Sequence, residues 1–222
     1  MVAATAVIVV SGGGPVPGSV AARLPAGPDV TVVAADSGVD TALALGLRVD
    51  LVVGDLDSVS ADGLATAVAA GAVVEQHPAD KDATDLALAL DAAAGLLGGA
   101  GAVVVVGGGG GRFDHLLAGT LALADPARAG LRITAHLGDA TVHVVHGGGR
   151  ADVDAAAGAL LSILPVGGPA GGVTTRGLAW PLDGATLVPG TTWGVSNVVT
   201  EPPAAVSVAT GTALVVLPGG EP

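Results

Sequence analysis

Two aspartates, Asp55 and Asp57, stand on either side of a single leucine in the stretch LVVGDLDSVS at residues 51–60. Carboxylates this close repel each other unless a cation lies between them. Side chains two residues apart project to the same side of an extended chain, so both can reach one ion. The pair therefore predicts a cation site. Carboxylate oxygens, completed by water and substrate phosphates, are the ligands that Mg²⁺ prefers.

Three further polar motifs follow apolar runs that we expect to be strands. Asp36-Ser37-Gly38 follows the run at 30–35, KDATD (81–85) follows the run at 72–75, and GGGGGRFDH (107–115) follows the run at 102–106. In an open parallel sheet, the loops after the strands emerge along one edge, where ligands bind. Mutual repulsion there would be costly without cations. The acidic residues expected at this edge are Asp36, Asp55, Asp57, Asp82, Asp85 and Asp114.

The same aspartates have a simpler interpretation as helix caps. Taken singly, Asp36, Asp82 and Asp114 each fit the start of a following helix, where a short acidic side chain is favourable. Asp55 does not, because Ser60 is the better cap for the helix that follows it. Six aspartates crowded on one edge would repel one another without cations, so we favour the metal site.

Two cations accompany the acidic motifs. Lys81 is the only lysine of the chain, and it is either a phosphate contact or an ordinary solvated charge. Arg112 follows a run of five glycines, whose backbone N–H groups can approach phosphate while the guanidinium adds bidentate contacts. Neither GxGxxG nor the GK[ST] of a P-loop is present, which argues against a dinucleotide fold and a Walker-type NTPase. The residues thus indicate a Mg²⁺-dependent enzyme acting on a polyphosphate.

The elements that must position these motifs alternate between strands and helices. We expect helices near 38–46, 60–70, 83–97 and 114–124, between continuous apolar strands at 6–10, 30–35, 50–53, 72–75 and 102–106. This pattern predicts an α/β domain with a doubly wound parallel sheet over residues 1–130. From residue 131 short Val, Thr and Leu runs separated by glycine and proline predict an all-β, sandwich-like domain over 131–222.

Composition narrows the partners. The chain of 222 residues has a net charge of −12, which argues against nucleic acid and against an anionic membrane surface as partners. Cysteine is absent, which excludes disulfides and thiolate metal sites. No apolar run has the length of a membrane span, and the first ten residues fit a strand better than a signal peptide, so we expect a cytoplasmic protein.

Six motifs, in order and at appropriate spacing, resemble those of the thiamine pyrophosphokinases. They are AADSG (34–38), GDLDS (54–58), KDATD (81–85), GGRFDH (110–115), GLAWPL (177–182) and GVSN (194–197). The resemblance spans nearly the whole chain. Ser37 departs from the family's usual DGG, a change that affects the shape of the loop.

The resemblance implies transfer of a pyrophosphoryl group from ATP to the thiamine hydroxyl, giving AMP and thiamine diphosphate. It also implies a homodimer, with thiamine bound between the α/β domain of one subunit and the sandwich of the other. Carried onto this sequence, the Mg²⁺ ligands would be Asp55, Asp57 and Asp85, and the catalytic set would add Asp36 and Arg112. The ATP and phosphate site would comprise Ser58, Lys81, Asp82, Thr84, Gly110, Gly111, Arg112, Asp114 and His115. Thiamine would be bound by Trp180, Ser196 and Asn197.

Thiamine offers a cationic thiazolium and a flat pyrimidine, and an aromatic face attracts both by about 0.5–2 kcal/mol. In a chain with two tryptophans and no tyrosine, Trp180 is the better candidate, and we expect Trp193 to pack within the sandwich. Asp36 is a further metal ligand or the group that accepts the hydroxyl proton, and His115 is another candidate acceptor.

Three other functions stay open at this point. A related diphosphokinase acting on a hydroxymethylpterin-like alcohol would share the acidic motifs but need not share GLAWPL and GVSN. A non-catalytic nucleotide or thiamine sensor would bind without turnover. A structural α/β protein whose aspartates are all caps would show no specific response to Mg²⁺ or ATP.

Overall fold

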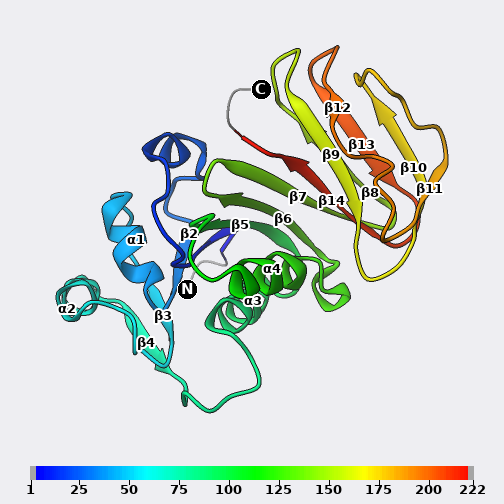
Figure 1. Ribbon diagram of the computed structural model, residues 1–222. Coiled ribbons are helices and arrows are strands. Elements are labelled where there is room, and N and C mark those ends of the chain that lie inside the picture. Colours follow the sequence, from blue (N-terminus) through cyan, green and yellow to red (C-terminus); the bar gives the residue numbers. More distant parts are fainter. Residues whose placement is uncertain (1–3, 220–222) are drawn as a thin grey trace. The chain divides into compact units, whose positions relative to one another are not determined.

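The computed structural model describes residues 4–219, which form two compact units (Figure 1). The first unit runs to Ala122 and also includes Gly130–Gly138. The second unit comprises Leu123–Ala129 and the residues from Asp139 on. The chain therefore passes from the first unit into the second, returns for one strand, and leaves again.

A six-stranded parallel sheet forms the first unit. Neighbouring strands follow the order β4-β3-β2-β1-β5-β6, and every pair is parallel. The predicted doubly wound parallel sheet is confirmed. The strands are β1 (Ala6–Val10), β2 (Val30–Ala35), β3 (Leu51–Gly54), β4 (Val73–Gln76), β5 (Gly101–Gly107) and β6 (Leu131–Leu137).

Helices cover this sheet on two sides, with α1 and α2 on one and α3 and α4 on the other (Figure 1). The interior between strands and helices is built from small aliphatic side chains; Ile8 and Val32 of the strands pack with Val39 of α1 and Ala67 of α2. Within residues 4–219 no helix combines the length and apolar character needed to cross a membrane. The helices are α1 (Gly38–Ala44), α2 (Ala61–Ala69), α3 (Asp85–Leu96) and α4 (Phe113–Leu123), with short 3-10 turns at Gly18–Arg23 and Pro126–Arg128.

The second unit is a sandwich of two antiparallel sheets, as predicted. Side chains from both sheets, such as Leu161 and Val215 of one and Val173 and Val206 of the other, share one buried core. One sheet has the order β12-β9-β14-β7, with β12 (Asn197–Val198), β9 (Leu160–Pro165), β14 (Thr212–Leu217) and β7 (Ala140–His146). The other has the order β11-β10-β13-β8, with β11 (Ala185–Leu187), β10 (Ala170–Arg176), β13 (Ala204–Val208) and β8 (Gly149–Val153).

The division into units differs from the boundary expected at residue 131. The strand at 131–137 pairs in parallel with β5, from Gly101 opposite Leu131 to Gly107 opposite Leu137. It is therefore the sixth strand of the first unit's sheet. Its Thr- and Leu-containing pattern is equally typical of either sheet, so composition alone placed it with the β-rich half.

Candidate active site

The carboxyl ends of β2 and β3 carry the first part of the site. Asp36 follows β2 directly, is 7% exposed, and donates its backbone N–H to the Val53 carbonyl over 2.9 Å. Its carboxylate accepts hydrogen bonds from the hydroxyl of Ser58 and from the Ser58 backbone N–H, the latter over 3.4 Å. Asp36 thus faces the loop that carries Asp55 and Asp57.

Gly54, the last residue of β3, makes this approach possible. Its φ of +148° lies in the region that favours glycine, and a Cβ built there would lie 3.0 Å from Asp85 Oδ1 and 3.2 Å from the Asp36 Cβ. A side chain at this position would therefore crowd Asp85 and Asp36, which would have to move by a few tenths of an ångström. The glycine of GDLDS allows the carboxylates after β2 and at the start of α3 to come close together.

The turn between Asp55 and Asp57 is left-handed rather than extended. Leu56 has φ 67°, and the Asp57 backbone N–H donates to Asp55 Oδ1 over 3.4 Å. The two side chains therefore do not share one side of an extended chain, and that prediction was wrong. The two carboxylates nevertheless converge, because the turn folds the chain back on itself.

Asp36, Asp55 and Asp57 each place one carboxylate oxygen so that the three atoms lie within 4.8 Å of one another. The charge of Asp55 is the main cause that raises the pKa of Asp57 above its usual value. Repulsion of this kind is relieved by a cation. The oxygen donors are of the type that Mg²⁺ prefers, so the residues fit a magnesium ion.

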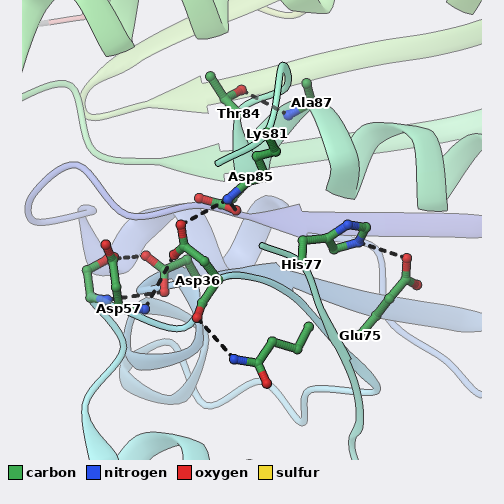
Figure 2. A network of polar contacts seen from close by, with 11 residues as sticks. Asp36, Asp57, Glu75, His77, Lys81, Thr84, Asp85 and Ala87 are labelled. Atoms are coloured by element: carbon green, nitrogen blue, oxygen red, sulfur yellow. Dashed lines mark hydrogen bonds and ion pairs between the residues drawn. The ribbon is translucent and has the colours of Figure 1, made fainter. Parts of the chain in front are cut away.

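Asp85 joins the cluster through Lys81 (Figure 2). The lysine Nζ lies 2.9 Å from Asp55 Oδ2 and 3.1 Å from Asp85 Oδ1, and its side chain is only 14% exposed. The hydrogen bond from Lys81 lowers the pKa of Asp55, and that same bond raises the pKa of Lys81. Lys81 is thus not the solvated surface charge that was the alternative. We call Asp36, Asp55, Asp57, Lys81 and Asp85 the acidic edge.

Asp85 Oδ1 has a further property that bears on metal binding. The atom is buried and has no hydrogen-bond partner among the described residues, although it forms the ion pair with Lys81. Buried carboxylate oxygens are ordinarily satisfied. The predicted metal ligands Asp55, Asp57 and Asp85 therefore include an oxygen with spare capacity, while the geometry adds Asp36 to the group.

The simpler interpretation of the aspartates as helix caps is wrong for three of them. Thr84 caps α3 by accepting the Ala87 N–H over 3.2 Å, and Asp82 is exposed beside it. Asp114 lies inside α4, which begins at Phe113, and the Asp36 side chain turns to Ser58. Ser60 does cap α2, accepting the Gly63 N–H over 2.9 Å, as predicted.

The glycine-rich loop after β5 packs on the loop after β1. Gly108 and Gly110 donate their N–H groups to the carbonyls of Gly12 and Gly13 over 3.1 and 3.0 Å. Gly12 and Gly13 were not among the predicted site residues, although the glycine run after the first strand was the available signal. Gly110, Gly111 and His115 are exposed on this loop and the adjoining turn of α4.

Arg112 forms a bidentate pair with Asp114 at the start of α4. Its Nε lies 3.2 Å from Asp114 Oδ1 and a terminal nitrogen lies 2.6 Å from Oδ2. The hydrogen bonds from Arg112 are the main cause that lowers the pKa of Asp114 to about 2. Both side chains are mostly exposed, at 71% and 65%, so the guanidinium remains open to an incoming anion.

Gln76, the last residue of β4, was also missed. Its amide nitrogen donates to the Asp55 carbonyl over 3.4 Å and so supports the turn that carries the two aspartates. Beside it, His77 Nε2 lies 2.9 Å from Glu75 Oε1 (Figure 2). The position of Gln76 at the end of a strand was the only signal in the sequence.

Trp180, Ser196 and Asn197 lie in the second unit, apart in the chain from the acidic motifs. The Trp180 side chain is exposed, with 62% of the residue accessible, whereas Asn197 is 4% exposed. Trp193 is 56% exposed, so our expectation that it packs within the sandwich was wrong. We call residues 177–182 and 194–197 the tryptophan segments.

Backbone strain coincides with the motifs. Among residues 4–219, the non-glycine residues with positive φ are Asp36 (47°), Leu56 (67°) and Ser196 (58°). A non-glycine residue in this region costs of order 1–3 kcal/mol and persists where its surroundings hold it. All three belong to, or lie inside, motifs chosen from the sequence for their chemistry.

A parallel sheet with carboxylates and glycine-rich loops along its carboxyl edge defines an α/β protein of the class whose ligands bind at that edge. Two family models match this chain: thiamin pyrophosphokinase, catalytic domain, over residues 28–135, and thiamin pyrophosphokinase, vitamin B1 binding domain, over residues 150–215. The chain belongs to the thiamine pyrophosphokinase family. The comparison with curated proteins gave no match.

Solved structures with these names share the fold. The thiamine pyrophosphokinase from Bacillus subtilis superposes with a TM-score of 0.80 at 23% identity, covering 97% of this chain and 100% of its own. That from Geobacillus thermodenitrificans gives 0.73 at 27% identity, covering 97% and 98%. The more distant thiamin pyrophosphokinase from Candida albicans gives 0.72 at 12% identity, covering 96% and 88%. The fold is therefore shared even where sequence identity is as low as 12%.

Proposed function

We propose that this protein transfers the pyrophosphoryl group of ATP to the hydroxyl of thiamine, giving thiamine diphosphate and AMP. The observation that carries the proposal is the acidic edge, where Asp36, Asp55 and Asp57 bring oxygens within 4.8 Å of one another beside Lys81. Membership of the family supplies the substrate, and the motifs of the second unit support thiamine over another alcohol.

Asp55 and Asp57 would hold Mg²⁺, with Asp85 as the predicted third ligand and Asp36 as the further carboxylate that the geometry offers. The bound ion would offset the charge of the phosphates and of the transition state. The turn at Leu56 and the absence of a side chain at Gly54 allow these carboxylates to lie close together before the substrate binds. Such preorganisation spares reorganisation during the reaction.

The cations and the glycine loop would hold the phosphates. Lys81 already lies between two carboxylates and can turn its ammonium to an anion beside them. Arg112 would offer its guanidinium and Gly111 a backbone N–H group, while the Gly110 N–H holds the loop in place through the Gly13 carbonyl. Ser58, Asp82, Thr84, Asp114 and His115 complete the proposed ATP site.

The thiamine oxygen would attack the β-phosphorus in line. The new O–P bond forms as the bond from that phosphorus to the α,β-bridging oxygen breaks, and AMP leaves with the electron pair. The hydroxyl proton would pass to Asp36 or His115. Most of the acceleration would come from positioning and charge neutralisation.

Trp180 would stack on thiamine, since its ring is exposed while its backbone is fixed. The family resemblance further supports a homodimer with the site shared between subunits. We expect the protein to act in the cytoplasm, where ATP is supplied.

A product assay tests the proposal. The protein is incubated with ATP, Mg²⁺ and thiamine, and the nucleotides and thiamine esters are separated by chromatography. AMP and thiamine diphosphate should form in equal amounts, only with Mg²⁺, and not with the Asp57→Asn variant. ADP with thiamine monophosphate would overturn pyrophosphoryl transfer. Binding of both substrates without turnover would favour a sensor, and turnover only with a hydroxymethylpterin would favour the related diphosphokinase.

A further inference from the structure

The side chain of Asn197 is occupied by the backbone of Trp180. Its Oδ1 accepts the Trp180 N–H over 3.1 Å and its Nδ2 donates to the Trp180 carbonyl over 2.7 Å. The same Oδ1 also accepts the Val198 N–H over 2.9 Å. One amide group therefore satisfies both backbone groups of a residue 17 positions away in the chain.

These side-chain bonds extend the antiparallel pairing of the two backbone segments. Leu178 and Val199 form an antiparallel bridge, and the Ala179 N–H donates to the Val198 carbonyl over 2.9 Å. At Trp180 the ladder would need the backbone of Asn197, but that backbone pairs with β9 as part of β12. The Asn197 side chain takes its place, since a primary amide offers the same donor and acceptor as a peptide group.

The segment behind Asn197 is also fixed. The Ser196 N–H donates to Ser162 Oγ over 3.0 Å, and the Gly194 carbonyl accepts the Ile163 N–H over 2.9 Å. A Cβ on Gly194 would lie 2.8 Å from the Ile163 carbonyl oxygen, which explains the glycine. Asn197 is thus anchored to β9 on one side while it holds Trp180 on the other.

Asn197 has little left to offer a ligand. Two protein donors use its carbonyl oxygen, one of its two N–H bonds is used, and the residue is 4% exposed. Trp180 has the opposite character, with a fixed backbone and a residue that is 62% exposed. A large ring that is ordered before the ligand arrives loses less freedom on binding.

We propose that Asn197 is a positioning residue that fixes Trp180 for a flat, cationic aromatic ligand, and that it acts through Trp180 rather than by contact with the ligand. The identity of that ligand as thiamine rests on the proposed function. The positioning itself does not, so the two can fail separately.

The first test needs no ligand. In a Trp193→Phe background, Trp180 is the only tryptophan, and its fluorescence anisotropy decay and acrylamide quenching report its motion. Asn197→Ala should increase the amplitude of motion and the quenching of Trp180. Asn197→Asp, which keeps the size but sets a carboxylate oxygen against the Trp180 carbonyl oxygen, should also increase both. Unchanged motion in both variants would overturn the proposal.

Ser207→Ala is the matched control, because Ser207 Oγ donates to the Thr174 carbonyl over 3.2 Å in the same unit and, within residues 4–219, has no hydrogen bond to Trp180. It should leave the Trp180 signals unchanged. Thermal unfolding of each variant separates a local effect from loss of the fold. If Asn197→Ala does not fold, Asn197→Asp alone decides the outcome.

The second test is a double-mutant cycle on thiamine affinity. Asn197→Ala should weaken thiamine binding in the natural protein and have no further effect once Trp180→Ala is present, while ATP affinity stays unchanged. Additive losses would show that Asn197 contacts the ligand itself and would overturn the proposal. Absence of thiamine binding to the natural protein would count against the proposed function, and the fluorescence test would still decide the role of Asn197.

Discussion

The acidic edge and the tryptophan segments prepare for a ligand in opposite ways. The acidic edge gathers four carboxylates around one lysine, and the charge of Asp55 raises the pKa of Asp57. The tryptophan segments use no charge: a neutral, buried amide holds Trp180, whose ring remains exposed. In the acidic edge, carboxylates still repel one another. In the tryptophan segments, the backbone of Trp180 has its hydrogen bonds satisfied.

This difference indicates when each region becomes complete. The hydrogen bonds that fix the Trp180 backbone are supplied by the chain itself, so we expect the tryptophan segments to be ordered by folding alone. The acidic edge still needs positive charge, because one lysine cannot neutralise four carboxylates. We therefore expect substitutions in the acidic edge to change the response to Mg²⁺ and substitutions in the tryptophan segments to change affinity for the organic substrate.

The largest effect is expected for Asp57→Asn. Loss of a metal-holding carboxylate should lower turnover by about 10³-fold, comparable with removal of a group that stabilises the transition state. Since the pKa of Asp57 is raised, its ionisation opposes folding above its ordinary value of 3.8. The variant should therefore unfold at an equal or higher temperature without Mg²⁺ and lose the stabilisation that Mg²⁺ gives the natural protein.

The matched control for Asp57→Asn is Asp62→Asn, which removes an exposed carboxylate from the first turn of α2. It should leave both turnover and the Mg²⁺ response unchanged. Full activity of Asp57→Asn would show that turnover does not depend on the Asp57 charge. An equal loss in Asp57→Asn and Asp62→Asn would show that the effect is not specific to the acidic edge.

A smaller effect is expected for Ser58→Ala. The Ser58 hydroxyl donates to the carboxylate of Asp36, which is 7% exposed, so its removal should destabilise the fold by about 1–2 kcal/mol. Urea unfolding without and with Mg²⁺ measures this. Addition of Mg²⁺ should reduce the difference from the natural protein, and a difference unaffected by Mg²⁺ would show that Asp36 lies outside the ion's reach.

Trp180→Ala sharpens the other side of the comparison. Loss of the aromatic face should weaken thiamine binding by roughly two- to thirtyfold, the equivalent of about 0.5–2 kcal/mol, and leave ATP binding nearly unchanged. Calorimetric titration with each substrate gives both values. Trp193→Ala, which removes the other exposed tryptophan of this unit, is the control. Equal losses for the two substrates would contradict stacking.

The smallest effect on stability is expected for Arg112→Gln. The pair with Asp114 is mostly exposed, so solvent screens it and unfolding should change little. The depressed pKa of Asp114 contributes stability that is present above 3.8 and is lost as the pH falls towards about 2. In the variant, the Asp114 pKa should rise towards 3.8, which NMR titration of its carboxyl carbon measures. A pKa still near 2 would assign the shift to another partner.

Much of the first unit could be predicted because its signals are local. Continuous apolar runs gave β1 to β5 within a residue or two, and polar residues just after them gave the acidic edge. One prediction for the acidic edge was wrong, namely the extended conformation between Asp55 and Asp57. The left-handed turn at Leu56 depends on hydrogen bonds across the loop, which residue spacing does not encode. The β6 strand was assigned to the other half because its partner, β5, is set by tertiary pairing.

The second unit was harder to predict in detail. Two of its strands escaped notice: β8 has the sequence GRADV, with two charges and a glycine, and β12 is two residues long. The role of Asn197 could not be found either, because the bonded residues lie 17 positions apart. Trp180 was found from the GLAWPL motif and from its scarcity, since an aromatic residue is conspicuous in a chain with so few.

The path of the chain has a consequence for shortening or recombining this protein. Residues 123–129 belong to the second unit, while 130–138 return to the first as β6. No single cut therefore yields two intact halves: a fragment ending at 122 would leave the β5 edge of its sheet unpaired, and a fragment beginning at 139 would lack residues 123–129. A chimera that exchanges one unit with a relative must therefore place its junctions at all three crossing points, after residues 122, 129 and 138.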